Sequence, residues 1–80
     1  MNRVYLMGKI ITDIEFKFII NSKNISVAMF KIKTIKDNQI INIKAYNELA
    51  DYFYSKYNTG DTIVIEGRVK GNSVTVNHLE

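Results

Sequence analysis

Several residue types that carry particular chemistries are missing from this 80-residue chain. There is no cysteine, which excludes disulfide bonds, zinc fingers and thiol catalysis. There is one histidine, His78, and the chain has no metal-binding histidine pair, glycine-rich phosphate loop or nucleophile elbow. We therefore expect no metal, no cofactor and no enzymatic activity.

Long apolar segments are also missing. No stretch approaches the roughly 20 apolar residues that a transmembrane helix requires, and the N-terminal residues lack the apolar region of a signal peptide. A cytoplasmic protein without a membrane partner is expected. Proline, linkers and repeats are absent too, so the length predicts one domain, residues 1–78. The last two residues, Leu79 and Glu80, are interpreted as a vector-derived scar outside the fold.

The residues that are present suit a small core and an anionic partner. Hydrophobic residues make up 46% of the chain, which is sufficient for the limited core that a domain of this size buries. The formal net charge is +3, which favours an anionic partner only slightly.

Alternation of apolar and polar residues with a period of two predicts strands along most of the chain. The first strand spans residues 3–12, and residues 14–20 continue its extended pattern. Gly8 inside the first strand predicts either a bend or a close approach of another backbone. The remaining four strands span residues 25–36, 39–46, 62–70 and 73–78. The alternation places Val27, Met29, Lys31, Lys33, Ile40, Asn42, Lys44 and Tyr46 outward, and Ala28, Phe30, Ile32, Ile41, Ile43, Ala45, Ile63, Ile65, Gly67 and Val69 inward.

One helix interrupts the strands. We expect the helix to begin after Asn47, whose side chain caps it, and to end at about Tyr57; Leu49, Phe53 and Tyr57 form an apolar stripe along it at four-residue spacing. Gly60 lies past its end. Five strands with a helix between the third and the fourth predict an all-β OB-fold, a five-stranded Greek-key barrel. The alternative is a five-stranded sheet capped by a helix without barrel closure.

Short segments along nearly the whole chain match one known family in order and spacing. They are NRVYLMGKI (2–10), EFKF (15–18), VAMF (27–30), INIKAYNELA (41–50), YNTGD (57–61) and VIEGRV (64–69). Together they resemble the bacterial single-stranded-DNA-binding protein family. The resemblance implies an OB-fold that binds single-stranded DNA or RNA, assembles as a homodimer or homotetramer, and serves DNA replication and repair.

The chain also departs from the family pattern. Ile14 stands where the family has proline, and of the two aromatic stacking positions on the third strand only Tyr46 is matched, because Ile40 occupies the other. Tryptophan is absent, and the connections at 37–38 and 71–72 are short. These departures lower the DNA affinity that the resemblance implies.

Binding of single strands requires cations near the phosphates and flat rings that stack on bases. The outward positions of the second and third predicted strands supply Lys31, Lys33, Lys44 and Tyr46. We expect the positive surface to continue onto Arg3, Lys9, Arg68 and Lys70. In the alternative interpretation the lysines only solvate an outer face, and Tyr46 is a partly buried ring.

The first predicted strand also exposes an apolar row, Tyr5, Met7 and Ile11, which predicts a subunit interface. Phe16 and Phe18 are expected to pack, with stacking on a base as the alternative for Phe18. Two other functions fit the same fold. One is a primosome-like accessory subunit that binds a protein, and the other is a purely structural oligomerisation barrel.

Overall fold

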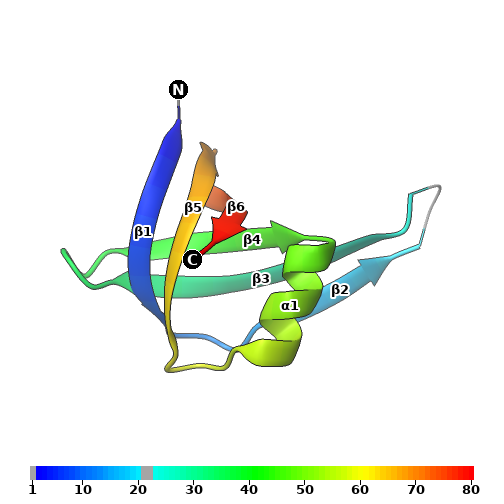
Figure 1. Ribbon diagram of the computed structural model, residues 1–80, viewed down its shortest axis with the longest axis horizontal. Helices are drawn as coiled ribbons and strands as arrows, with labels where there is room; N and C mark the ends of the chain where they lie inside the picture. The colour runs from blue at the N-terminus through cyan, green and yellow to red at the C-terminus, as the bar shows by residue number, and fades with distance from the viewer. Residues whose placement is uncertain (1, 21–22) are drawn as a thin grey trace.

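The structure is a computed structural model that describes residues 2–20 and 23–80. Within these described residues, six strands and one helix follow one another in the order shown in Figure 1. Their bounds are β1 Arg3–Ile10, β2 Glu15–Ile19, β3 Ile25–Thr34, β4 Ile40–Tyr46, α1 Glu48–Lys56, β5 Thr62–Lys70 and β6 Ser73–Leu79.

The strands close into a barrel. The order of hydrogen-bonded neighbours is β1-β5-β6-β4-β3, and a further β1–β3 pairing closes the circle. All pairings are antiparallel except β4–β6, which is parallel. The predicted OB-fold is therefore confirmed, and the open sheet is excluded. β2 pairs only with the first half of β3, and the two form a hairpin that projects from the barrel (Figure 1).

The strand count is six rather than five because the first predicted strand is broken. β1 pairs with β3 through Gly8↔Thr34 and Ile10↔Ile32, whereas β2 pairs with it through Glu15↔Met29. Between these pairings residues 11–14 lie opposite only residues 30–31 of β3, so the chain after β1 has two extra residues that leave the ladder. β1 therefore ends at Ile10 and not at residue 12. By this count the helix lies between the fourth and fifth strands.

The core fills the barrel and continues beneath the helix. Among its members, Ile10, Ile32, Ile43, Ile65 and Phe53 are fully buried. The Phe53 ring lies 5.1 Å from that of Phe30 on β3, measured between centroids. The predicted helical stripe is confirmed, since Leu49 and Tyr57 pack against the same core.

Two glycines allow strands to approach closely. A Cβ on Gly8 would lie 2.9 Å from the backbone oxygen of Lys33, where β1 meets β3. A Cβ on Gly67 would lie 2.5 Å from the backbone oxygen of Thr75, beside the irregularity in the β5–β6 ladder. The close approach predicted at Gly8 is confirmed.

The capping prediction at Asn47 is wrong in its mechanism. Asn47 precedes the helix, but its side chain makes no capping hydrogen bond. Its backbone has a positive φ of 56°, and its N–H donates to the Ser26 oxygen on β3 at 2.9 Å. The turn from β4 into α1 is therefore held by a hydrogen bond of the Asn47 backbone to β3, and not by a cap from the Asn47 side chain.

Three predictions need correction, and two of them are placements from the alternation rule. Val27 is on the outward face but is buried, because it lies between Lys17 on β2 and Tyr46 on β4. Val69 is exposed, because β5 extends past the Arg3↔Arg68 pair where β1 begins.

The third correction concerns the C-terminal residues. Leu79 is the last residue of β6, pairs with Ile65 and packs against the core. The Glu80 N–H donates to the Val64 oxygen at 2.9 Å. Excluding residues 79–80 from the fold was therefore wrong, while their origin as a scar stays a prediction.

Candidate nucleic-acid interface

A groove of about 420 Å³ crosses the outer face of β3 and β4. One wall is the connector after β1, and the other is the turn between β5 and β6. Its lining residues are Thr12, Asp13, Glu15, Met29, Phe30, Lys31, Asn42, Ile43, Lys44, Asn72 and Ser73. The groove therefore brings together four separate parts of the chain.

Hydrogen bonds hold both walls to the groove floor. The Thr12 hydroxyl accepts from the Lys31 N–H at 3.0 Å, and the Ile11 N–H donates to the Lys31 oxygen at 2.9 Å. On the opposite side the Asn42 amide donates to the Asn72 oxygen at 3.3 Å. These hydrogen bonds fix the connector after β1 and the β5–β6 turn relative to β3 and β4, and so fix the two walls of the groove.

Four of the predicted cations lie close together. Lys31 and Lys44 line the groove, from neighbouring strands. Lys33 follows Lys31 at the next outward position of β3, and Lys9 on β1 is paired directly with Lys33. The four lysines form one patch on the outward positions of β1, β3 and β4, which we call the lysine patch.

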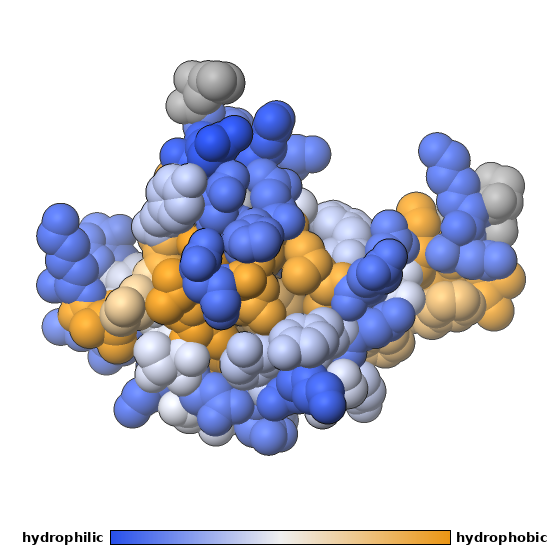
Figure 2. Space-filling view, in the orientation of Figure 1, coloured by the Kyte–Doolittle hydropathy of each residue, from blue (hydrophilic) through white to orange (hydrophobic). Residues whose placement is uncertain are grey.

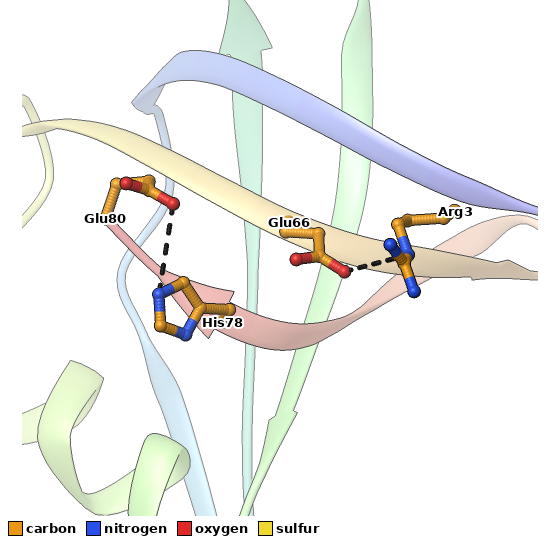
Figure 3. Close-up of polar contacts among 4 residues, drawn as sticks. All are labelled: Arg3, Glu66, His78 and Glu80. Carbon is orange, nitrogen blue, oxygen red and sulfur yellow. Dashed lines mark ion pairs between the residues drawn. The ribbon is translucent and has the colours of Figure 1, made fainter.

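The other predicted cations lie apart from this patch. Arg68 and Lys70 are paired with Thr75 and Ser73, so they are separated from the groove by the width of β6. Arg3 is opposite Arg68, but its Nε lies 3.0 Å from a carboxylate oxygen of Glu66 (Figure 3). The ion pair makes Arg3 a weaker candidate for a phosphate contact.

The remaining ion pair in Figure 3 joins the one histidine to the chain end. The His78 Nε2 lies 3.9 Å from a Glu80 carboxylate oxygen, and both side chains are exposed. Within residues 2–20 and 23–80, no three histidine or acidic side chains gather to hold a metal ion. Nor does any helix in that part of the chain have the length and apolarity to cross a membrane.

Tyr46 lies at one end of the same outer face. It is two residues beyond Lys44 on β4, is 39% exposed and does not line the groove. A base would reach this ring only after leaving the groove toward the end of β4. The prediction that Tyr46 and the lysines share a face is consistent with this placement.

The sequence did not identify several groove residues. The outward positions of Met29 and Asn42 followed from alternation, but no role was assigned to them. The acidic wall, Asp13 and Glu15, was not predicted, because it depends on the loop-out after β1. Ile40, at the position where the resemblance led us to expect an aromatic ring, is exposed beside Lys33 and offers an apolar surface there.

Part of the predicted subunit interface is present as an exposed apolar surface. Tyr5 is 66% and Met7 51% exposed on β1. Val64 is paired with Met7, and the Ile35 N–H donates to the Met7 oxygen, so both enlarge this surface. Figure 2 shows apolar side chains where β1 and β5 face the viewer. Ile11 does not belong to the row, since it follows the end of β1 and is half-buried.

The two aromatic residues of β2 differ. Phe16 stacks on Tyr54 of α1 with 4.8 Å between ring centroids, as the packing prediction expected. Phe18 is 55% exposed, so its predicted packing is wrong. The hairpin carries Phe18 beyond the part of the sheet that the helix covers.

Comparison with known proteins identifies the family. The model of the single-strand binding protein family matches residues 1–78. No curated protein matches the chain in sequence. The structure is similar to the SSB domain of a Synechococcus sp. protein, with a TM-score of 0.87 and 16% identity over 100% of this chain and 94% of that one.

A second structural relative is the single-stranded DNA binding protein of Thermus aquaticus. The wild-type protein gives a TM-score of 0.86 at 23% identity, and a deletion mutant gives 0.87 at 21%. Both alignments cover all of this chain and 39% and 40% of the respective relatives, so the chain spans about two fifths of their length. On the family match over nearly its whole length, this chain belongs to the single-strand binding protein family.

Proposed function

We propose that this protein binds single-stranded DNA without sequence preference, through phosphate contacts of the lysine patch and limited base stacking. The groove that Lys31 and Lys44 line carries the proposal, because it lies on the outer face of β3 and β4 and continues onto Lys33 and Lys9. Arg68 and Lys70 extend the path across β6. Arg3 contributes only if its ion pair with Glu66 opens.

Family membership and the named relatives support this proposal over the alternatives. The relative from Thermus aquaticus is described as a single-stranded DNA binding protein. We place the function in the cytoplasm, in DNA replication and repair, without catalysis. A protein-binding accessory subunit remains the second candidate, favoured by the exposed apolar surface around Met7.

A titration with fluorescent oligo-dT at several salt concentrations tests the proposal. Each phosphate neutralised on a single strand contributes about −0.7 to the slope of log K against log salt. With about three to five contacts the slope should be about −2 to −3.5. No binding of a long oligonucleotide at low salt would reject the DNA function and favour the purely structural oligomerisation barrel. Oligo-rU in parallel compares RNA with DNA.

Stacking by Tyr46 is a separate prediction. Tyr46→Ala should weaken binding by roughly 1–3 kcal/mol and leave the salt slope unchanged, because stacking involves no counterion release. Tyr46→Phe is the control and should bind like the parent, since it keeps the ring. Circular dichroism must show both variants folded. If a folded Tyr46→Ala variant binds as tightly as the parent, Tyr46 does not stack on a base and binding at this face is electrostatic alone.

We also propose that the exposed surface around Tyr5 and Met7 joins subunits into a dimer or tetramer. A monomeric protein rarely leaves such a contiguous apolar surface uncovered. Met7→Lys should weaken this association by placing a charge in its centre, as measured by light scattering over a range of concentrations. Tyr52→Lys, which adds the same charge at an exposed position on α1, is the control. A parent protein that is already monomeric at high concentration would contradict the proposal.

A further inference from the structure

The outer edge of β2 has no partner in the described part of the chain. β2 is the last strand in the sheet order and pairs only with β3. Among the described residues, no other backbone hydrogen bond involves Glu15–Ile19. The hairpin projects from the barrel, so nothing in Figure 1 covers this edge. An open edge without proline or a bulge is a template for another strand.

The charges of β2 are complementary to those of a second copy. Glu15 and Lys17 are both exposed on the outward face, on either side of Phe16. If two copies pair antiparallel about Phe16, Glu15 of each copy lies opposite Lys17 of the other. Opposite charges in such cross-strand pairs are stabilising. Shifting the register to centre on Lys17 places two lysines opposite each other, which is destabilising.

The apolar side of β2 supports the same register. Phe16 stacks on Tyr54, and both Tyr54, at 57%, and Phe18 remain largely exposed. Figure 2 shows apolar surface on this hairpin. Pairing about Phe16 places the two Phe16 rings side by side and Phe18 of each copy opposite Ile14 of the other. These exposed rings then become part of one apolar cluster.

The helices leave room for this arrangement. α1 packs mainly on β3 and β4, and less on β2. With strands about 4.8 Å apart, the two helices would be roughly 19 Å apart on the same side of the joined sheet. A helix with its side chains is about 10–12 Å wide. The space between them suits the two Tyr54 rings.

We propose that two copies of this chain join edge to edge through β2, antiparallel and centred on Phe16, with reciprocal Glu15–Lys17 pairs. This interface is separate from the surface around Met7. The outer faces of both copies form one sheet, and their grooves lie side by side. The pairing also neutralises Glu15 at the groove wall. Any gain in DNA affinity from neutralising Glu15 rests on the proposed DNA binding, whereas the pairing itself does not.

Charge reversal in the full chain tests the pairing without DNA. Sedimentation equilibrium is measured on Met7→Lys, which should weaken association through β1. We expect a weak monomer–dimer equilibrium to remain. In that background Glu15→Lys and Lys17→Glu should each weaken dimerisation about tenfold, because each turns two attractive pairs into two repulsive ones.

Two samples should then restore the dimer. One is the double variant Glu15→Lys/Lys17→Glu, in which every pair is again complementary. The other is an equimolar mixture of the two single variants, which pairs two carboxylates with two lysines. Glu15 and Lys17 are exposed in both copies, so circular dichroism should show an unchanged fold for every variant. A Met7→Lys protein that is monomeric throughout, or single variants that dimerise like their parent, would overturn the proposal. Failure of both the double variant and the mixture to restore dimers would do the same.

Discussion

Replacing Lys31 and Lys44 together by glutamate should reduce the affinity for oligo-dT by about a hundredfold or more near 0.1 M salt. At that salt each phosphate neutralised on a single strand contributes about fivefold to the affinity, relative to about 1 M salt. Neutralising two contacts therefore costs about 25-fold, and the new carboxylates repel the phosphates in addition. Both side chains line the groove from the neighbouring strands β3 and β4, so one phosphate backbone would pass both.

The salt dependence of binding distinguishes direct lysine–phosphate contacts from a general attraction between the net charges of protein and DNA. Lys31→Ala and Lys44→Ala should each make the slope shallower by about 0.7, and the double alanine variant by about 1.4. The matched control is Lys36→Glu/Lys56→Glu, which changes the net charge equally at exposed sites outside the groove. The control should lose far less affinity. Equal losses in both double variants would mean that only net charge matters and that the groove is not the binding site.

Replacing Phe53 by alanine should lower the free energy of unfolding by about 3–5 kcal/mol. Phe53 is fully buried and contacts Phe30 and Tyr57 at 5.1 and 5.5 Å between ring centroids. A chain of this size has a total stability of about 4–12 kcal/mol, so the variant is expected to be partly unfolded at 37 °C. Alanine cannot fill the space between helix and barrel.

Urea unfolding followed by circular dichroism measures this loss. Tyr52→Ala is the control, since it truncates an exposed aromatic on the same helix and should cost about 1 kcal/mol. Binding to oligo-dT by the folded fraction should be little affected, because α1 is on the opposite side of the sheet from the groove. A Phe53→Ala variant within 1 kcal/mol of the parent would show that the helix contributes little to the stability of the barrel.

The amino-acid sequence by itself determined which strands form and which way most side chains point. Alternation with a period of two is a local property, and burial of one face enforces it. The bounds of β4, β5 and the helix differ from the predicted ones by one residue or less, and Lys31, Lys33 and Lys44 are on the outward face as predicted. The order of strands and helix, together with the family resemblance, predicted the closure of the barrel, which no single local pattern contains.

The tertiary structure alone decided which side chains are neighbours. Strand pairing joins residues far apart in the chain, so the partner of Lys9 on β3 and the Arg3–Glu66 ion pair have no sequence signal. The two-residue loop-out after Ile10 is a pairing effect as well, and it both removes Ile11 from the predicted row and builds the acidic wall of the groove. The exposure of Phe18 has the same origin, because it depends on how far the hairpin extends beyond the helix. Alternation assigns a residue to a face, but only the closed barrel and its projecting hairpin determine what covers that face.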